Sequence, residues 1–129
     1  MNSKVLESFA FKLLLSVVAV FAPIQGMLGA ALTLIMADLV TGVWAARKLG
    51  KPITSSGLKR TVVKLLVYEG VIALGWIGEH YLMSDMIPVA KIAAGYIGLT
   101  ELTSAYENIN NIAGNDLLKG ILDKLNSKG

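Results

Sequence analysis

Asp38 is the residue of this chain with the clearest chemical potential, because it ends a stretch from Leu13 to Ala37 that contains no charge. Small residues follow it at helical spacing: Thr41, Gly42, Ala45 and Ala46. A lone carboxylate inside a membrane costs at least about 2.5 kcal/mol, so Asp38 is expected to face protein or water. Small neighbours let a second helix approach closely. The pattern predicts helix association or a polar lumen, and simple pairing within a bundle is the open alternative.

Glu69 and Lys91 are two more ionisable residues within apolar stretches. Glu69 is expected at a depth similar to that of Asp38, and two adjacent carboxylates would not both ionise easily. Two alternatives follow: one of the carboxylates is protonated, or each pairs with Lys64 or Arg60. Small residues share the expected helical face of Lys91: Ala94, Gly95 and Gly98. Snorkelling of Lys91 to the outer interface explains that lysine more simply than a functional role.

The residue inventory argues against an enzyme. The chain has one histidine and no cysteine, and it lacks paired-histidine spacing, a phosphate-binding loop and a nucleophile elbow. His80, flanked by Glu79 and Asp85, is the one conceivable metal set, and an ordinary interfacial histidine explains it better. We therefore expect no catalytic residue, no metal and no cofactor.

Composition indicates that the chain folds in a membrane. Hydrophobic residues make up 54% of the 129 residues and charged residues 16%, against about 25% charged residues in soluble domains. The mean hydropathy is +0.62. A bilayer core of roughly 30 Å takes about 20 apolar helical residues to cross, and the uncharged stretch 13–37 exceeds that length. The predicted fold class is an all-α membrane protein.

Four transmembrane helices are predicted, and their approximate spans are 5–22, 26–46, 62–78 and 87–102. Pro23 and Gly26 favour a turn between the first two spans. Pro23 also opposes signal-peptide cleavage after Ala22, so the first span is interpreted as retained. Three spans, with 13–37 as a single crossing, are the alternative. Residues 1–104 are the expected transmembrane domain and 105–129 a cytoplasmic tail.

Basic residues between the second and third spans predict the orientation. These topology-setting residues are Arg47, Lys48, Lys51, Lys59, Arg60 and Lys64. Such a segment stays in the cytoplasm by the positive-inside rule, whereas the short connection 79–86 carries acids and no Lys or Arg. Four spans then place both termini in the cytoplasm, and three spans would place the N-terminus outside. The topology explains the basic stretch without nucleic-acid binding.

The tail is expected to contain an amphipathic helix. Its apolar residues recur at helical spacing: Leu117, Leu118, Ile121, Leu122 and Leu125. Asn115 is the expected N-cap, and Lys119 can pair with Asp123 four residues later. Such a helix lies either on the membrane surface or on a partner subunit.

Three stretches resemble the toxin-secretion/phage-lysis holin family. Residues 38–46, DLVTGVWAA, are similar to its D-x-x-T-G-x-x-A-A signature. The basic stretch 54–60, TSSGLKR, with Lys64 after it, continues the match, and 101–109, ELTSAYENI, resembles the family's E-x-x-S-x-x-E-N stretch. The resemblance spans about residues 32–114, with the motifs in the family's order and spacing.

The resemblance implies a small phage or prophage protein that oligomerises in the bacterial cytoplasmic membrane. Lesions formed by such proteins depolarise the cell and let an endolysin or a large toxin leave. The endolysin or toxin is then a functional partner that does not bind the chain stably. The implied partners are therefore the lipid bilayer and further copies of the chain. The candidates for assembly or pore contacts are Asp38, Thr41, Gly42, Ala45, Ala46, Glu69, Lys91, Ala94, Gly98, Glu101, Ser104, Glu107 and Asn108. Small-residue ridges at Gly26/Ala30, Gly42/Ala46 and Ala90/Ala94/Gly98 are expected to supply helix contacts within and between subunits.

Two other functions remain open at the level of the sequence. A holin antagonist or accessory subunit would use the same small-residue faces without permeabilising the membrane. A small ion transporter would use Asp38 and Glu69 as a coupling-ion site, although no inverted repeat supports it.

Overall fold

The structure is a computed structural model that describes residues 2–114 and 117–129, and these residues form helices without any strand. The helices are α1 (Ser3–Phe21), α2 (Gln25–Lys48), α3 (Ser55–Ile77), α4 (Val89–Ala113) and α5 (Leu117–Asn126). A 3₁₀ turn, Ala22–Ile24, joins α1 to α2, and a π-helical turn, Gly78–Leu82, extends α3. The all-helical prediction is confirmed. The expected N-cap Asn115 lies outside the described residues.

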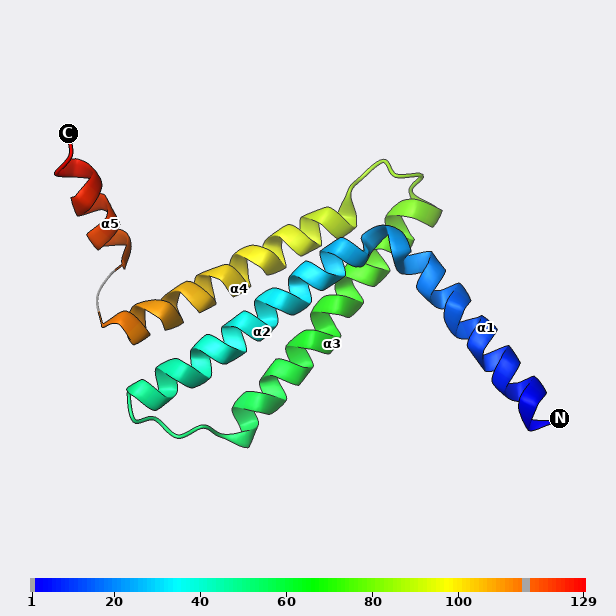
Figure 1. The fold of residues 1–129 in the computed structure, drawn as a ribbon. Coiled ribbons are helices and arrows are strands. Elements are labelled where there is room, and N and C mark those ends of the chain that lie inside the picture. Colours follow the sequence, from blue (N-terminus) through cyan, green and yellow to red (C-terminus); the bar gives the residue numbers. More distant parts are fainter. Residues whose placement is uncertain (1, 115–116) are drawn as a thin grey trace.

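The turn at Ala22–Ile24 separates α1 from the rest of the molecule. Pro23 lacks a backbone N–H, so the α-helical hydrogen-bond ladder cannot run through it. Beyond this turn α1 extends away from the other helices (Figure 1) and has no buried residue. Near the turn the Trp76 indole N–H donates to the Val20 carbonyl oxygen at 3.3 Å, which ties the end of α1 to α3.

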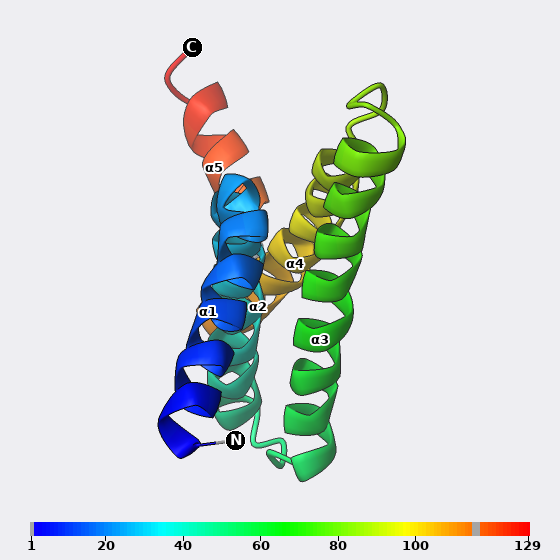
Figure 2. The same cartoon turned by 90° about the vertical axis from the view of Figure 1, so that its right-hand side faces the viewer.

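Helices α2, α3 and α4 pack together as a bundle (Figures 1 and 2). Its apolar core consists of Ile24, Ala31, Ile72, Ala90 and Ile97. At Gly75 a Cβ atom would lie 3.4 Å from the Ala90 backbone nitrogen, so the glycine permits close approach of α3 and α4. Small residues therefore set the distance between these helices.

The predicted small-residue ridges differ in how far they are buried in the structure. Ala90 is buried and Ala94 packs against the core, whereas Gly98 approaches Leu34 of α2. Gly26 and Ala30 are exposed in the single chain, so this ridge is not part of the core of the bundle, and its expected contact between copies stays a prediction. The next residue, Ala31, is buried in the core.

Two helical runs, Ser3–Lys48 and Ser55–Leu82, are long and apolar enough to cross a membrane by length and composition. The first has 46 residues, and as a straight helix it would extend roughly 70 Å at 1.5 Å per residue. That is about twice the thickness of a bilayer core. The break at Ala22–Ile24 divides this run into two pieces of membrane-spanning length.

Helices α3 and α4 both extend beyond the predicted spans. α3 begins at Ser55 instead of 62, because the Thr54 side chain caps it by accepting a hydrogen bond from the Gly57 N–H. α4 continues past the predicted end at 102 and the predicted domain boundary at 104. It ends at Gly114, whose φ of +70° lies in the left-handed region that glycine adopts without strain.

Glu79 fixes the start of α4 from the end of α3. Its side chain is buried, and its Oε2 atom accepts a hydrogen bond from the Ala90 N–H at 2.7 Å. This N–H belongs to the first turn of α4, where backbone donors have no partner within the helix. Nearby, the His80 ring stacks on Trp76 and its Nδ1 lies 3.2 Å from Asp85 Oδ1.

Candidate functional site

One buried ionic cluster joins the three helices of the bundle. Asp38 lies on α2, Lys64 on α3 and Glu101 on α4. The Lys64 Nζ atom is 2.9 Å from Asp38 Oδ2 and 3.1 Å from Glu101 Oε1. A single ammonium group therefore bridges two carboxylates from two different helices. We call these three residues the ionic cluster.

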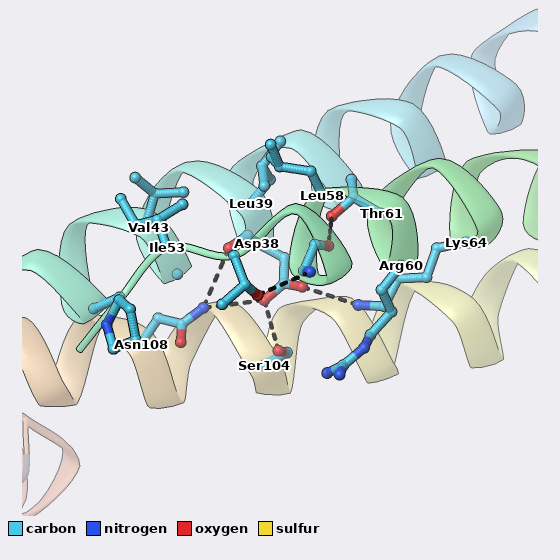
Figure 3. Close-up of a pocket in the computed structure, with 15 residues that line it drawn as sticks. Asp38, Leu39, Val43, Ile53, Leu58, Arg60, Thr61, Lys64, Ser104 and Asn108 are labelled. Carbon is cyan, nitrogen blue, oxygen red and sulfur yellow. Dashed lines mark hydrogen bonds and ion pairs between the residues drawn. The ribbon is translucent and has the colours of Figure 1, made fainter.

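Ser104 and Asn108 complete the contacts of Asp38 from successive turns of α4. The Ser104 hydroxyl donates to Asp38 Oδ1 at 2.6 Å. The Asn108 amide nitrogen donates to the same oxygen at 3.0 Å and to the Thr41 hydroxyl at 3.2 Å. Figure 3 shows Asp38, Ser104 and Asn108 directed toward one another, with Lys64 reaching in from α3. The Asp38 carboxylate is the acceptor at the centre of this network.

Burial makes this pairing energetically important. The Glu101 side chain is 0% exposed, and the Asp38 and Lys64 side chains are 16% and 25% exposed. Removing one partner of a buried ion pair typically costs about 3–5 kcal/mol, because the remaining charge stays desolvated. The cluster therefore fixes the register of α2, α3 and α4 against one another.

Small residues of α2 let α4 reach the cluster. Ala45 is buried and Ala46 is partly buried. A Cβ atom built at Gly42 would lie 3.4 Å from the Asn108 amide nitrogen. That distance is tight, so a larger side chain at 42 would displace the Asn108 amide.

Residues 15–127 match the sequence model of the bacteriophage holin family, and the match includes all three stretches that build the cluster. The chain belongs to the bacteriophage holin family. No curated protein and no solved structure matches it. Family membership and the apolar helical runs together indicate a membrane protein.

A pocket of about 430 Å³ lies beside the ionic cluster. Its walls come from α2, α3, α4 and the connection 49–54 (Figure 3). Asp38, Lys64, Ser104 and Asn108 form its polar side, and Arg60 lines it as well. The apolar side consists of Leu39, Val43, Ile53 and Leu58. The polar side chains already bond one another across the helices, an arrangement that holds helices together.

Glu69 lies apart from the ionic cluster, and no ion pair joins it to Lys64 or Arg60 among the described residues. The pairing alternative for Glu69 is therefore wrong. Lys64 is engaged by Asp38 and Glu101. Glu69 instead lines a second pocket, about 490 Å³ in volume, where α1, α2 and α3 meet. Within the described part of the chain its Oε1 atom is buried without a hydrogen-bond partner. Apolar residues dominate that pocket: Val17, Val18, Phe21, Leu28 and Ala73.

The remaining candidate residues lie outside the cluster. Lys91 and Glu107 are exposed on α4. Five of the six residues predicted to set the topology are exposed: Arg47, Lys48, Lys51, Lys59 and Arg60. The Lys48 ammonium also donates to the Ile112 carbonyl oxygen, which ties the end of α4 to the end of α2.

Sequence reasoning named Lys64 both as a topology-setting charge and as a candidate partner of Asp38, and the structure contains that pair. It missed two other contacts. The first is the contact of Lys64 with Glu101, although a lysine that follows Val62 and Val63 and precedes two leucines needs partners inside an apolar stretch. The capping role of Glu79 depends on its spatial proximity to Ala90, for which the sequence has no comparable signal.

The close approach at Gly42 leads to a testable prediction. Gly42→Leu is expected to displace Asn108 and to abolish or retime membrane lesions, while the amount of inserted protein stays unchanged. Gly29→Leu is the matched control, because no heavy atom lies within 4 Å of a Cβ at Gly29. The measurement is the onset of lysis in a bacterial host at equal membrane levels. Identical onset in both variants and wild type would refute the role assigned to Gly42.

Proposed function

We propose that this chain oligomerises in the bacterial cytoplasmic membrane and permeabilises it, so that an endolysin or a toxin leaves the cell. The observation that carries the proposal is the convergence of three holin-like motifs on one buried cluster. Asp38, Lys64 and Glu101 come from separate helices of a bundle whose outer surface is apolar. A soluble or catalytic role would need neither feature.

The exposed surface of the bundle supports insertion into lipid. Large apolar side chains point outward on all three helices; examples are Val40, Leu66, Leu74 and Leu99, with 59–70% of each exposed. In water such a surface would favour aggregation, whereas hydrocarbon solvates it. The proposed arrangement has four spans, formed by α1, α2, α3 and α4, with both termini in the cytoplasm.

The ionic cluster suggests how a stable inserted protein could become a lesion. Charged groups are costly inside lipid unless they face protein or water. In a single copy the Asp38 carboxylate is held by Lys64, Ser104 and Asn108, so these polar groups contact one another within the bundle. In an assembly we propose that these polar groups turn toward a shared aqueous lumen. The process needs no catalysis and no cofactor.

The direct test uses purified protein in vesicles loaded with a small dye and with a folded cargo protein. The proposal predicts that dye and cargo leave together above a threshold protein density. Retention of both at high density would overturn it in favour of an antagonist or accessory subunit. Saturable, pH-dependent ion flux with full retention of cargo would overturn it in favour of a transporter.

Topology can be tested independently, because the chain has no native cysteine. Single variants Ser3→Cys, Ser84→Cys and Ser127→Cys would be treated in intact cells with a membrane-impermeant maleimide. Four spans predict labelling from outside at position 84 alone. Labelling at position 3 as well would contradict the four-span arrangement and support three spans.

A further inference from the structure

Helix α5 exposes an apolar surface that the rest of the chain does not cover. Ile121, Leu122 and Leu125 are 55%, 49% and 64% exposed. Their spacing places them on one side of the helix. Gly114 ends α4 in a left-handed conformation, and α5 then departs from the line of α4 (Figure 1). The helix therefore presents this surface beside the end of the bundle.

Two exposed lysines lie beside this apolar surface. Lys124 is within α5 and Lys128 just beyond it, and Asp123 is the neighbouring acid. The contact between Lys48 and Ile112 keeps the end of α4 next to the end of α2. α5 thus starts at the end of the bundle that carries the exposed basic residues Arg47, Lys51, Lys59 and Arg60.

We infer that α5 lies flat on the inner leaflet and binds anionic phospholipid. Its apolar side chains enter the boundary between headgroups and acyl chains, and its lysines contact the lipid phosphates. Charge complementarity favours anionic phospholipid over a second copy of the chain. A second copy would bring the same basic residues to the contact, whereas the inner leaflet is negatively charged. The inference rests on the proposed function only for the cytoplasmic location of this end.

A site-specific probe tests the inference in the full-length protein. Since the chain has no cysteine, Leu122→Cys can carry a single environment-sensitive fluorophore, and Asp123→Cys is the matched control on the polar side. The protein would be reconstituted into vesicles that contain phosphatidylglycerol and into vesicles of phosphatidylcholine alone. Accessibility to an uncharged aqueous quencher is the measured quantity.

The expected result is a probe at 122 that is shielded in anionic vesicles while the probe at 123 stays accessible. The double variant Lys124→Gln, Lys128→Gln should lower the ratio of shielded to accessible probe at 122. The expected decrease is about fivefold for each lysine that contacts the surface. Equal quenching at 122 and 123 in anionic vesicles would overturn the inference. Shielding that persists in phosphatidylcholine and rises with protein density would also overturn it, in favour of a second copy.

Cargo release from the same vesicles separates this inference from the proposed function. Insertion is monitored by tryptophan fluorescence, to which Trp44, 60% exposed on α2, and Trp76 of α3 both contribute. Release of cargo with an accessible probe at 122 would refute the lipid contact alone. A shielded probe in vesicles that retain their cargo would refute the proposed function alone.

Discussion

Replacing Lys64 by methionine should lower the free energy of unfolding by about 3–5 kcal/mol, because the buried Glu101 and the partly buried Asp38 then lose their shared cation. Lys64 lies within 3.1 Å of both Asp38 and Glu101, and the Glu101 side chain is fully buried. Methionine keeps the length and volume of the side chain, so the expected loss comes from charge. The measurement is unfolding of the purified protein in mixed micelles.

The matched control for this prediction is Lys59→Met. Lys59 lies on the same helix and is exposed, so its replacement removes the same charge without leaving a buried carboxylate. Lys59→Met should change stability by less than about 0.5 kcal/mol. Similar losses in both variants would show that the effect comes from net charge, and the account of the cluster would fail.

A second large effect is expected from Asp38→Leu, which should insert normally and fail to release a cytosolic protein. The carboxylate accepts hydrogen bonds from Lys64, Ser104 and Asn108. Hydrogen bonds to a charged group are worth about 1.5–3 kcal/mol each, and removal leaves the donors without their acceptor. Leucine favours the membrane interior, so insertion itself should be unchanged.

The measurement for Asp38→Leu is the delay between expression and escape of a reporter protein at matched membrane levels. Met36→Leu is the control, because Met36 is 45% exposed on the same helix. In cells that express Met36→Leu, the reporter should escape after the same delay as with the wild-type chain. The same delay with Asp38→Leu would remove the basis for assigning function to the ionic cluster.

The helices and the break between the first two were predictable from local patterns. The uncharged stretch and Pro23 are sufficient to predict two helices with a turn between them. Residues at a spacing of three or four on one helix, such as Glu101, Ser104 and Asn108, share a face by helix geometry alone. Their contact with Asp38 depends on how α4 packs against α2.

Partner choice was beyond the reach of local sequence patterns. Asp38 and Glu69 were expected at one depth with a common set of cations. In the structure Lys64 pairs with Asp38 and Glu101, and Glu69 lines a pocket with apolar residues of α1 and α2. The rotation of each helix about its axis decides these contacts, and α2 is rotated so that Ala31 is buried while Ala30 is exposed.

The most direct measurement follows membrane potential and escape of an endolysin-sized reporter together in a bacterial host that expresses the chain. If the chain permeabilises the membrane as proposed, a quiet interval is followed by sudden depolarisation and simultaneous escape of the reporter. Cells that express Lys64→Met at the same level should show neither event at that time. An intact membrane potential at high membrane levels of the wild-type chain would contradict the proposed function.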